Sequence, residues 1–279
     1  MTQSISVNTG TLSTRFQAIL DGLQVAGFAL TNQAAMRPLL AGAALENWKE
    51  FAQSWNDLGP DVYMADGGRY RKRRHGVYSV SAQGILRQPP QPHYQSRDYN
   101  SLNGGVQRWF APIIVDDGES SALGAIIDLC RRMFDAARGG PAQHDPQHDP
   151  QHDPQHDPQH DPWHVEAHQF RIEAQAGQPG KPTPEGMHRD GVDWVLVLLV
   201  ARENVASGET RIAGLSDTPN DNPLGSFTLT DPMDAAWVDD NRVMHGVTAI
   251  EKLDPSLPAY RDVLVVTFRH GEPGSGATL

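Results

Sequence analysis

Apolar side chains recur at helical spacing in three segments of the first half of the chain. Over residues 12–25, 44–58 and 120–137 they return every three or four positions, as on the buried face of an amphipathic helix. A short apolar run at residues 27–30 predicts a strand, and residues 63–110 contain short β-like pieces broken by Gly, Pro, Asn and Gln. We expect these helices to pack outside a β structure.

From residue 163 onward the pattern changes to short strands separated by turns. Clusters such as Asn220-Asp221-Asn222-Pro223 supply the turn residues. The predicted strands cover residues 165–174, 194–201, 208–213, 225–229, 235–238, 242–245 and 261–268. Such a regular succession of strands and turns indicates a sandwich or a jelly-roll barrel. We therefore predict a mainly β protein with flanking α-helices.

The bulk composition narrows the class of protein. A chain of 279 residues can bury a substantial core, and we expect a single domain with residues 1–60 as helical support and 163–270 as the β core. The net charge of −11 disfavours nucleic acid or an anionic membrane as partner. No apolar run could span a bilayer, no signal peptide is evident, and the single Cys130 is typical of a buried side chain in the reducing cytoplasm. We expect a soluble, cytoplasmic protein.

Residues 143–162 are five tandem copies of Gln-His-Asp-Pro. A proline at every fourth position excludes a regular helix and a central strand, and no apolar side chain offsets the entropy of ordering. We interpret the tract as a disordered, neutral loop insertion, although histidine-rich tracts also bind metal ions. Each His is directly followed by its Asp, so the tract lacks the ligand spacing that is found further along the chain.

The strongest candidate for chemistry is the sequence His188-Arg189-Asp190, together with His245. On a strand His188 and Asp190 face the same side while Arg189 faces away, and Gly191 permits a tight turn at the strand end. Two imidazoles and one carboxylate hold a redox metal on one face and leave three positions open, as non-haem Fe(II) oxygenases require. A His-x-Asp pair alone is weak evidence in a chain with twelve histidines, but the β context and His245 strengthen it. We predict His188, Asp190 and His245 as metal ligands.

Basic residues offer candidate sites for carboxylates. Arg261 opens the last predicted strand and shares its parity with Thr267, so both side chains are expected to face the barrel interior. A keto diacid needs such a fixed cation for its far carboxylate, but an ordinary charge at a strand start fits Arg261 equally well. The dense cluster at residues 69–75 is either a solvated strand edge or a wall that binds carboxylates.

The segment from Met187 to Phe268 resembles the Fe(II)/2-oxoglutarate dioxygenases that act on free amino acids, the L-isoleucine hydroxylase family, which includes biofilm-stress proteins of the BsmA type. The resemblance is looser upstream, extends back to about Arg69, and is interrupted by the Gln-His-Asp-Pro tract. The matching pieces are His188-Arg189-Asp190, Asn204-Val205-Ala206-Ser207-Gly208-Glu209-Thr210, His245-Gly246-Val247-Thr248, Ala259-Tyr260-Arg261-Asp262-Val263-Leu264, Tyr99-Asn100, Gly104-Gly105-Val106-Gln107-Arg108 and His168-Gln169-Phe170-Arg171.

This resemblance implies a fold, a set of cofactors and a reaction. The fold is a double-stranded β-helix, a cupin-like jelly roll, and the reaction is hydroxylation of a free, aliphatic L-amino acid or a similar small molecule. Fe(II), 2-oxoglutarate and O2 are the implied cofactors, and succinate and CO2 are released. The implied residues are His188, Asp190 and His245 for iron, Arg261 with Thr267 for 2-oxoglutarate, and Gln169, Arg171 and Arg73 for the substrate, with no catalytic residue beyond the metal ligands.

Two other functions fit parts of the pattern. A non-catalytic metal-binding or stress-response barrel would keep the fold for binding alone, but the complete triad and Arg261 argue against it. A zinc hydrolase also uses three protein ligands and a water. The sequence offers no well-placed general base for that chemistry and leaves Arg261 unexplained.

Overall fold

The computed structural model describes residues 10–40, 42–114, 121–139, 162–216 and 223–270. The Gln-His-Asp-Pro tract therefore lies outside the described residues except for Pro162. The helices are α1 (Gly10–Ala26), α2 (Gln33–Leu39), α3 (Ala43–Glu46), α4 (Trp48–Gln53), the 3-10 helix η1 (Ser54–Asp57) and α5 (Ala122–Arg138). The strands are β1 (Phe28–Thr31), β2 (Arg71–Ser81), β3 (Gly84–Arg87), β4 (Trp163–Glu173), β5 (Trp194–Glu203), β6 (Val205–Ser207), β7 (Thr210–Gly214), β8 (Gly225–Phe227), β9 (Ala235–Asp239), β10 (Val243–Val247), β11 (Ile250–Lys252) and β12 (Tyr260–Arg269).

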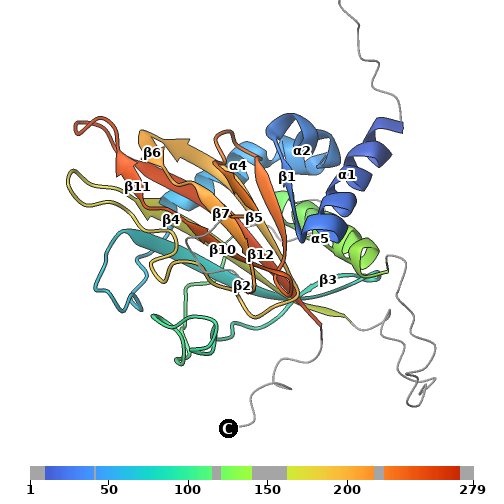
Figure 1. Ribbon diagram of the computed structural model, residues 1–279, viewed down its shortest axis with the longest axis horizontal. Helices are drawn as coiled ribbons and strands as arrows, with labels where there is room; N and C mark the ends of the chain where they lie inside the picture. The colour runs from blue at the N-terminus through green and yellow to red at the C-terminus, as the bar shows by residue number, and fades with distance from the viewer. Residues whose placement is uncertain (1–9, 41, 115–120, 140–161, 217–222, 271–279) are drawn as a thin grey trace, which may run out of the picture.

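Within the described residues the strands form one large sheet and two small ones. The seven-stranded sheet has the order β1-β9-β5-β12-β4-β2-β3, and the smaller sheets are β10-β7-β8 and β11-β6. All of these neighbours pair antiparallel. The helices α1, α2 and α5 gather on one side of the strands (Figure 1). A mainly β structure with flanking helices is what the sequence predicts.

The alternation of side chains along the strands separates two environments. On β4 the odd-numbered Val165 and Ala167 pack into the main core with the helices, and on β12 Leu264 and Val266 do the same. The residues between them face the other side of the large sheet, where they line a cavity. Register aligns these cavity residues across three strands, because Phe170 on β4 lies opposite Arg73 on β2 and Val263 on β12.

The helical layer differs from the prediction in two places. The single helix expected over residues 44–58 is divided into α3, α4 and η1, and the Oγ of Ser54 donates to the carbonyl of Phe51 at 2.7 Å where the last turn tightens. Helix α2 was not predicted because it contains Pro38; Asn32 caps it by accepting the Ala35 N–H at 2.9 Å.

The short strands β6 and β11 were not predicted either, since each has only three residues. Cys130 is buried and free, as expected.

No helix among the described residues is both long enough and apolar enough to cross a membrane.

Candidate active site

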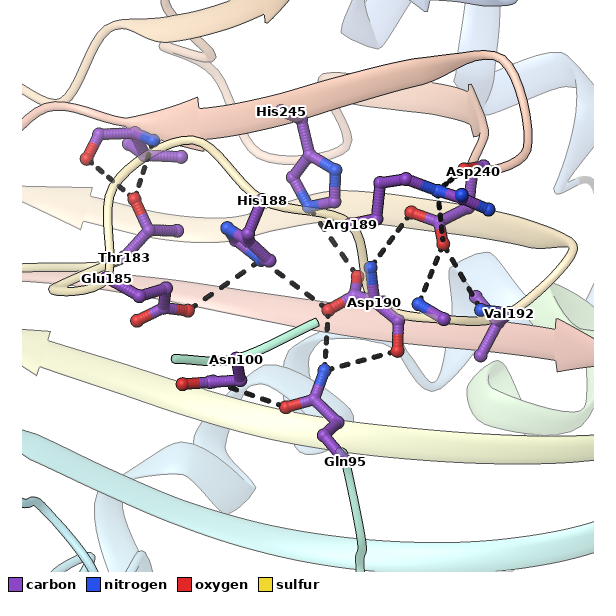
Figure 2. A network of polar contacts seen from close by, with 12 residues as sticks. Gln95, Asn100, Thr183, Glu185, His188, Arg189, Asp190, Val192, Asp240 and His245 are labelled. Atoms are coloured by element: carbon purple, nitrogen blue, oxygen red, sulfur yellow. Dashed lines mark hydrogen bonds and ion pairs between the residues drawn. The ribbon is translucent and has the colours of Figure 1, made fainter. Parts of the chain in front are cut away.

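The three predicted metal ligands meet at one end of the cavity. His188 lies in the loop before β5 and forms an antiparallel bridge with His245 of β10, in which each backbone N–H donates to the other's carbonyl at 2.9 Å. The Nε2 atoms of His188 and His245 each lie 3.5 Å from one oxygen of the Asp190 carboxylate. Figure 2 shows the three side chains pointing toward one another. The expected strand end is present as this isolated bridge at His188, and Asp190 lies in the loop that follows it.

A buried carboxylate holds the Asp190 loop in place. The side chain of Asp240 accepts the backbone N–H groups of Asp190, Gly191 and Val192 at 2.9, 2.8 and 3.1 Å (Figure 2). From the other side, Gln95 donates from Nε2 to Asp190 Oδ1 at 3.1 Å. The sequence did not single out Asp240 or Gln95, because Asp240 sits in an Asp-Asp-Asn run that is typical of an ordinary turn.

The electrostatics of the triad suit a divalent cation. Burial raises the pKa of Asp190, but the two imidazoles outweigh it and hold that pKa well below its usual range. Burial lowers the pKa of His245 to about 4, whereas the Asp190 carboxylate overcomes burial and raises the pKa of His188 to about 9. His188 Nδ1 lies 3.0 Å from the carbonyl of Gly186, a contact that leaves Nε2 as the ligand atom. The donor set therefore fits a metal such as Fe(II).

A buried arginine that forms no ion pair with any described residue faces the same cavity. Arg261 is 2% exposed, and its Nε and Nη2 atoms have no hydrogen-bond partner in the described part of the chain. Burial, together with nearby Arg202, lowers the pKa of Arg261 to about 10, so it stays charged at neutral pH. Thr267 lines the cavity on the same face of β12. Arg261 therefore offers a fixed cation to a carboxylate in the cavity.

Two predicted substrate residues lie on the wrong face of β4. Gln169 is fully buried and donates to Ser54 Oγ at 2.8 Å, while Arg171 pairs with Asp262 at 2.7 Å on the side away from the cavity. The prediction that Gln169 and Arg171 line the substrate pocket is therefore wrong. Their strand was located correctly, but its cavity face carries the alternate residues, such as His168 and Phe170.

The third predicted substrate residue, Arg73, does line the cavity. It is 4% exposed, and its guanidinium lies 3.8 and 4.4 Å from the ring centroids of Phe110 and Phe170. The basic cluster divides between the two faces of β2: Arg71 and Arg73 line the cavity, whereas Lys72 pairs with Glu173 outside it. Binding of a carboxylate by this cluster stays a prediction.

A second polar cluster lies in the same cavity and was not predicted. The carboxylate of Glu166 is surrounded by the imidazoles of His75, His93 and His168, and Arg108 is buried nearby. The alternation His164-Val165-Glu166-Ala167-His168 was the available signal, since polar residues at every second position mark one face of a strand.

Comparisons with known proteins agree with this fold and site. A family model described as 2OG-Fe dioxygenase matches residues 52–267. The crystal structure of a bsmA homolog from Methylobium petroleophilum PM1 is 33% identical, with a TM-score of 0.77 over 94% of this chain and 96% of that chain. The L-isoleucine-4-hydroxylase of Bacillus thuringiensis is 24% identical over 218 residues, which cover 76% of this chain and 81% of that protein. The 3(1)-hydroxy-L-isoleucine 4-dioxygenase of Pantoea ananatis (strain AJ13355) is 29% identical over 109 residues, 39% of this chain and less than half, 42%, of that protein.

A jelly roll with two imidazoles and a carboxylate beside a buried, unpaired arginine is the scaffold of an iron-dependent oxygenase. The chain belongs to the 2OG-Fe dioxygenase family. It is therefore an oxidoreductase that uses Fe(II), 2-oxoglutarate and O2. The predicted family, fold class and cofactors are confirmed.

Proposed function

We propose that this dioxygenase hydroxylates a free, aliphatic L-amino acid, or a close relative of one, and releases succinate and CO2. The observation that carries the proposal is a pair of buried arginines in the cavity, in addition to Arg261: Arg73 and Arg108 are both at least 96% buried, and Arg73 shares the carboxylate of Asp61, 3.9 Å away, with Arg71. One carboxylate of 2-oxoglutarate belongs at the metal and the other at Arg261. Two arginines thus remain for a carboxylate of the substrate.

His188, Asp190 and His245 would hold the iron through two imidazole nitrogens and one carboxylate. When bound, iron and 2-oxoglutarate supply the oxidising chemistry, in which O2 places one oxygen atom in the substrate as a hydroxyl group and the other in succinate. Asp240 and Gln95 keep the Asp190 carboxylate aimed at the two imidazoles. These contacts leave the ligands little freedom before the metal binds.

Arg261 orients 2-oxoglutarate by pairing with its distal carboxylate. Part of the cavity wall is apolar and includes Val197, Val263 and Val265. Such a wall excludes water and suits an aliphatic side chain of the substrate. The two relatives that act on isoleucine or hydroxyisoleucine support an amino acid of this size.

The test is a screen of the twenty amino acids for stimulated succinate release by the protein supplied with Fe(II) and 2-oxoglutarate. We expect aliphatic L-amino acids, L-isoleucine first among them, to stimulate release, and we expect the His188→Ala variant to lose it. Asp254→Asn, in an exposed loop, serves as the control variant. Stimulation by none of the twenty and by no hydroxylated aliphatic amino acid, or full turnover by His188→Ala, would refute the proposal.

A further inference from the structure

A largely buried carboxylate that lines the cavity does not belong to the triad. The side chain of Glu166 is 17% exposed, and its Oε2 atom lies 2.6 Å from His93 Nδ1, 3.0 Å from His75 Nε2 and 3.4 Å from His168 Nε2. Its other oxygen, Oε1, has one contact among the described residues, His164 Nε2 at 3.4 Å. Glu166 thus keeps acceptor capacity that faces the cavity.

Three histidines around a carboxylate also match the donor set of a metal site, but the geometry favours hydrogen bonds. The contacts of His93 and His75 have hydrogen-bond lengths, 2.6 and 3.0 Å, whereas the neighbouring donors of the triad stand 3.5 Å apart. Arg73 donates from Nη2 to His168 Nδ1 at 2.8 Å, so the proton of that neutral ring is on Nε2, facing Glu166.

The charge states of the cluster make Glu166 the lone anion at its centre. Burial lowers the pKa of His93 and His168, which keeps both imidazoles neutral at pH 7. Burial raises the pKa of Glu166, but the surrounding imidazoles outweigh it and hold that pKa well below its usual range. A negative charge is therefore held in the cavity by neutral N–H donors.

A cation and an anion, Arg73 and Glu166, lie on opposite sides of the His168 ring. One ring nitrogen of His168 contacts Arg73 and the other contacts Glu166, so the cation and the anion stand on either side of a single imidazole. The Nε atoms of Arg73 and Arg108 are buried without a hydrogen-bond partner in the described part of the chain. Burial and the neighbouring Arg71 lower the pKa of Arg73 well below its usual value, which an incoming anion would relieve.

This end of the cavity is also connected to the metal ligands. Arg108 donates from Nη2 to Gln95 Oε1 at 3.0 Å, and the amide nitrogen of the same glutamine donates to Asp190 Oδ1. The charges around Arg108 are mixed, since Arg71 is opposed by the carboxylates of Asp61, Glu185 and Glu166. A ligand with one positive and one negative group fits such surroundings better than a simple anion.

We propose that Glu166 binds the α-ammonium group and that Arg73 and Arg108 bind the α-carboxylate of an α-amino acid. This end of the cavity then selects amino acids over carboxylic acids with the same carbon skeleton. The inference rests on the proposed function, which places the substrate in this cavity.

The test compares two ligands that differ only in the ammonium group. L-Isoleucine and 3-methylpentanoate, and likewise L-leucine and 4-methylpentanoate, are assayed for succinate release and for anaerobic binding by calorimetry. Glu166→Gln should lower kcat/KM and affinity for the amino acids by about 10- to 100-fold, because a hydrogen bond to a charged group is lost. It should change the values for the carboxylic acids by less than about threefold.

Two further variants separate the roles of charge and position. Arg108→Lys loses the fork that pairs with a carboxylate and should weaken both kinds of ligand to a similar extent. Glu173→Gln, on the same strand but outside the cavity, should affect neither kind of ligand. If Glu166→Gln does not fold, the ligand affinities of the wild type serve as the test. The wild type should bind L-isoleucine at least about tenfold more tightly than either 3-methylpentanoate or isoleucinamide.

Several outcomes would overturn the inference. One is an equal effect of Glu166→Gln on amino acids and carboxylic acids. Another is a second bound Zn²⁺ or Fe(II) ion that disappears in Glu166→Gln, which would make the cluster a metal site. If the wild type turns over L-isoleucine and only the selectivity change is missing, the inference alone fails. If the wild type neither binds nor turns over any amino acid, the proposed function fails with it.

Discussion

The carboxylate of Asp240 accepts the backbone N–H of Asp190 at 2.9 Å, so one buried acid positions the acid that faces the metal site. The same side chain accepts two further N–H groups, from Gly191 and Val192. Burial, with the nearby charge of Asp190, raises the pKa of Asp240 to about 6. The loop that carries Asp190 is thus held in place by Asp240, which is not itself one of the predicted metal ligands.

Replacing Asp240 should therefore impair both folding and metal binding. Asp240→Ala leaves three backbone N–H groups unpaired, and we expect a loss of about 2–4 kcal/mol in the free energy of unfolding. Metal affinity should fall by about 10- to 100-fold, as for other residues that orient metal ligands. Urea unfolding and anaerobic Fe(II) titration measure the two effects, with Asp254→Asn as control. Unchanged metal affinity in Asp240→Ala would contradict this role.

Arg261 should govern the affinity for 2-oxoglutarate. Arg261→Lys keeps a positive charge but loses the fork that pairs with a carboxylate, so we expect KM for 2-oxoglutarate to rise by about tenfold or more. Arg171→Lys is the matched control, because Arg171 lies on the helical side of the sheet in an ion pair with Asp262. It should leave KM for both 2-oxoglutarate and the amino acid unchanged. A raised KM for 2-oxoglutarate in Arg171→Lys, together with an unchanged KM in Arg261→Lys, would place the cosubstrate elsewhere.

Gly191 should not tolerate a side chain. Its φ of +78° lies in the left-handed region, and an added Cβ would come within 2.6 Å of the Tyr99 ring. Gly177 has a similar φ of +71° with nothing within 4 Å, so Gly177→Ala isolates the backbone strain. We expect losses in the free energy of unfolding of about 1 kcal/mol for Gly177→Ala and about 2–3 kcal/mol for Gly191→Ala. Equal losses in urea unfolding would show that Tyr99 moves aside freely.

Acid should destabilise the protein through the histidines around Glu166. Burial lowers the pKa of His93 and His168 below 6.5, so these imidazoles stay neutral in the folded state while the unfolded chain takes up protons. Proton uptake then favours unfolding, and stability present above pH 6.5 is lost as the pH falls, by up to about 1.4 kcal/mol per pH unit for each histidine. Urea unfolding at pH 7.5 and 5.5 measures this loss, which should be smaller in His93→Gln. A pH-independent midpoint would contradict the neutral state of these rings.

The sequence located most strands and the three residues His188, Asp190 and His245 that meet in the structure, and their role as iron ligands stays a prediction. It did not determine which face of each strand lines the cavity and which face packs against the helices. Side chains alternate between the two faces of β4, so Gln169 and Arg171 share one face and His168 and Phe170 share the other. Residues of these types occur on either side of a sheet, so the pattern does not show which face lines the cavity. The choice depends on packing: Val165 and Ala167 join the helical core, which turns Glu166 and His168 toward the cavity. Local pattern alone contains no such information.

Asp240 is a residue whose role could not be predicted from the sequence. A short acidic run after a strand is typical of a turn, and only the tertiary structure brings its carboxylate beneath the Asp190 loop, fifty residues earlier in the chain. The triad could be predicted because iron requires a particular set of ligand types, which leaves a trace in the sequence. Asp240 supports a ligand only through the backbone of its loop, and such a residue leaves no recognisable pattern in the sequence. The single-domain organisation of the chain stays a prediction.

The most direct test of the central claim is the anaerobic visible absorption spectrum of the protein with Fe(II) and 2-oxoglutarate. If His188, Asp190 and His245 hold iron beside Arg261, the wild type should develop a metal-to-ligand charge-transfer band on addition of 2-oxoglutarate. The His188→Ala variant should lack this band while retaining the folded β structure by circular dichroism. An absent band in the wild type, or an identical band in His188→Ala, would contradict the assignment of this site.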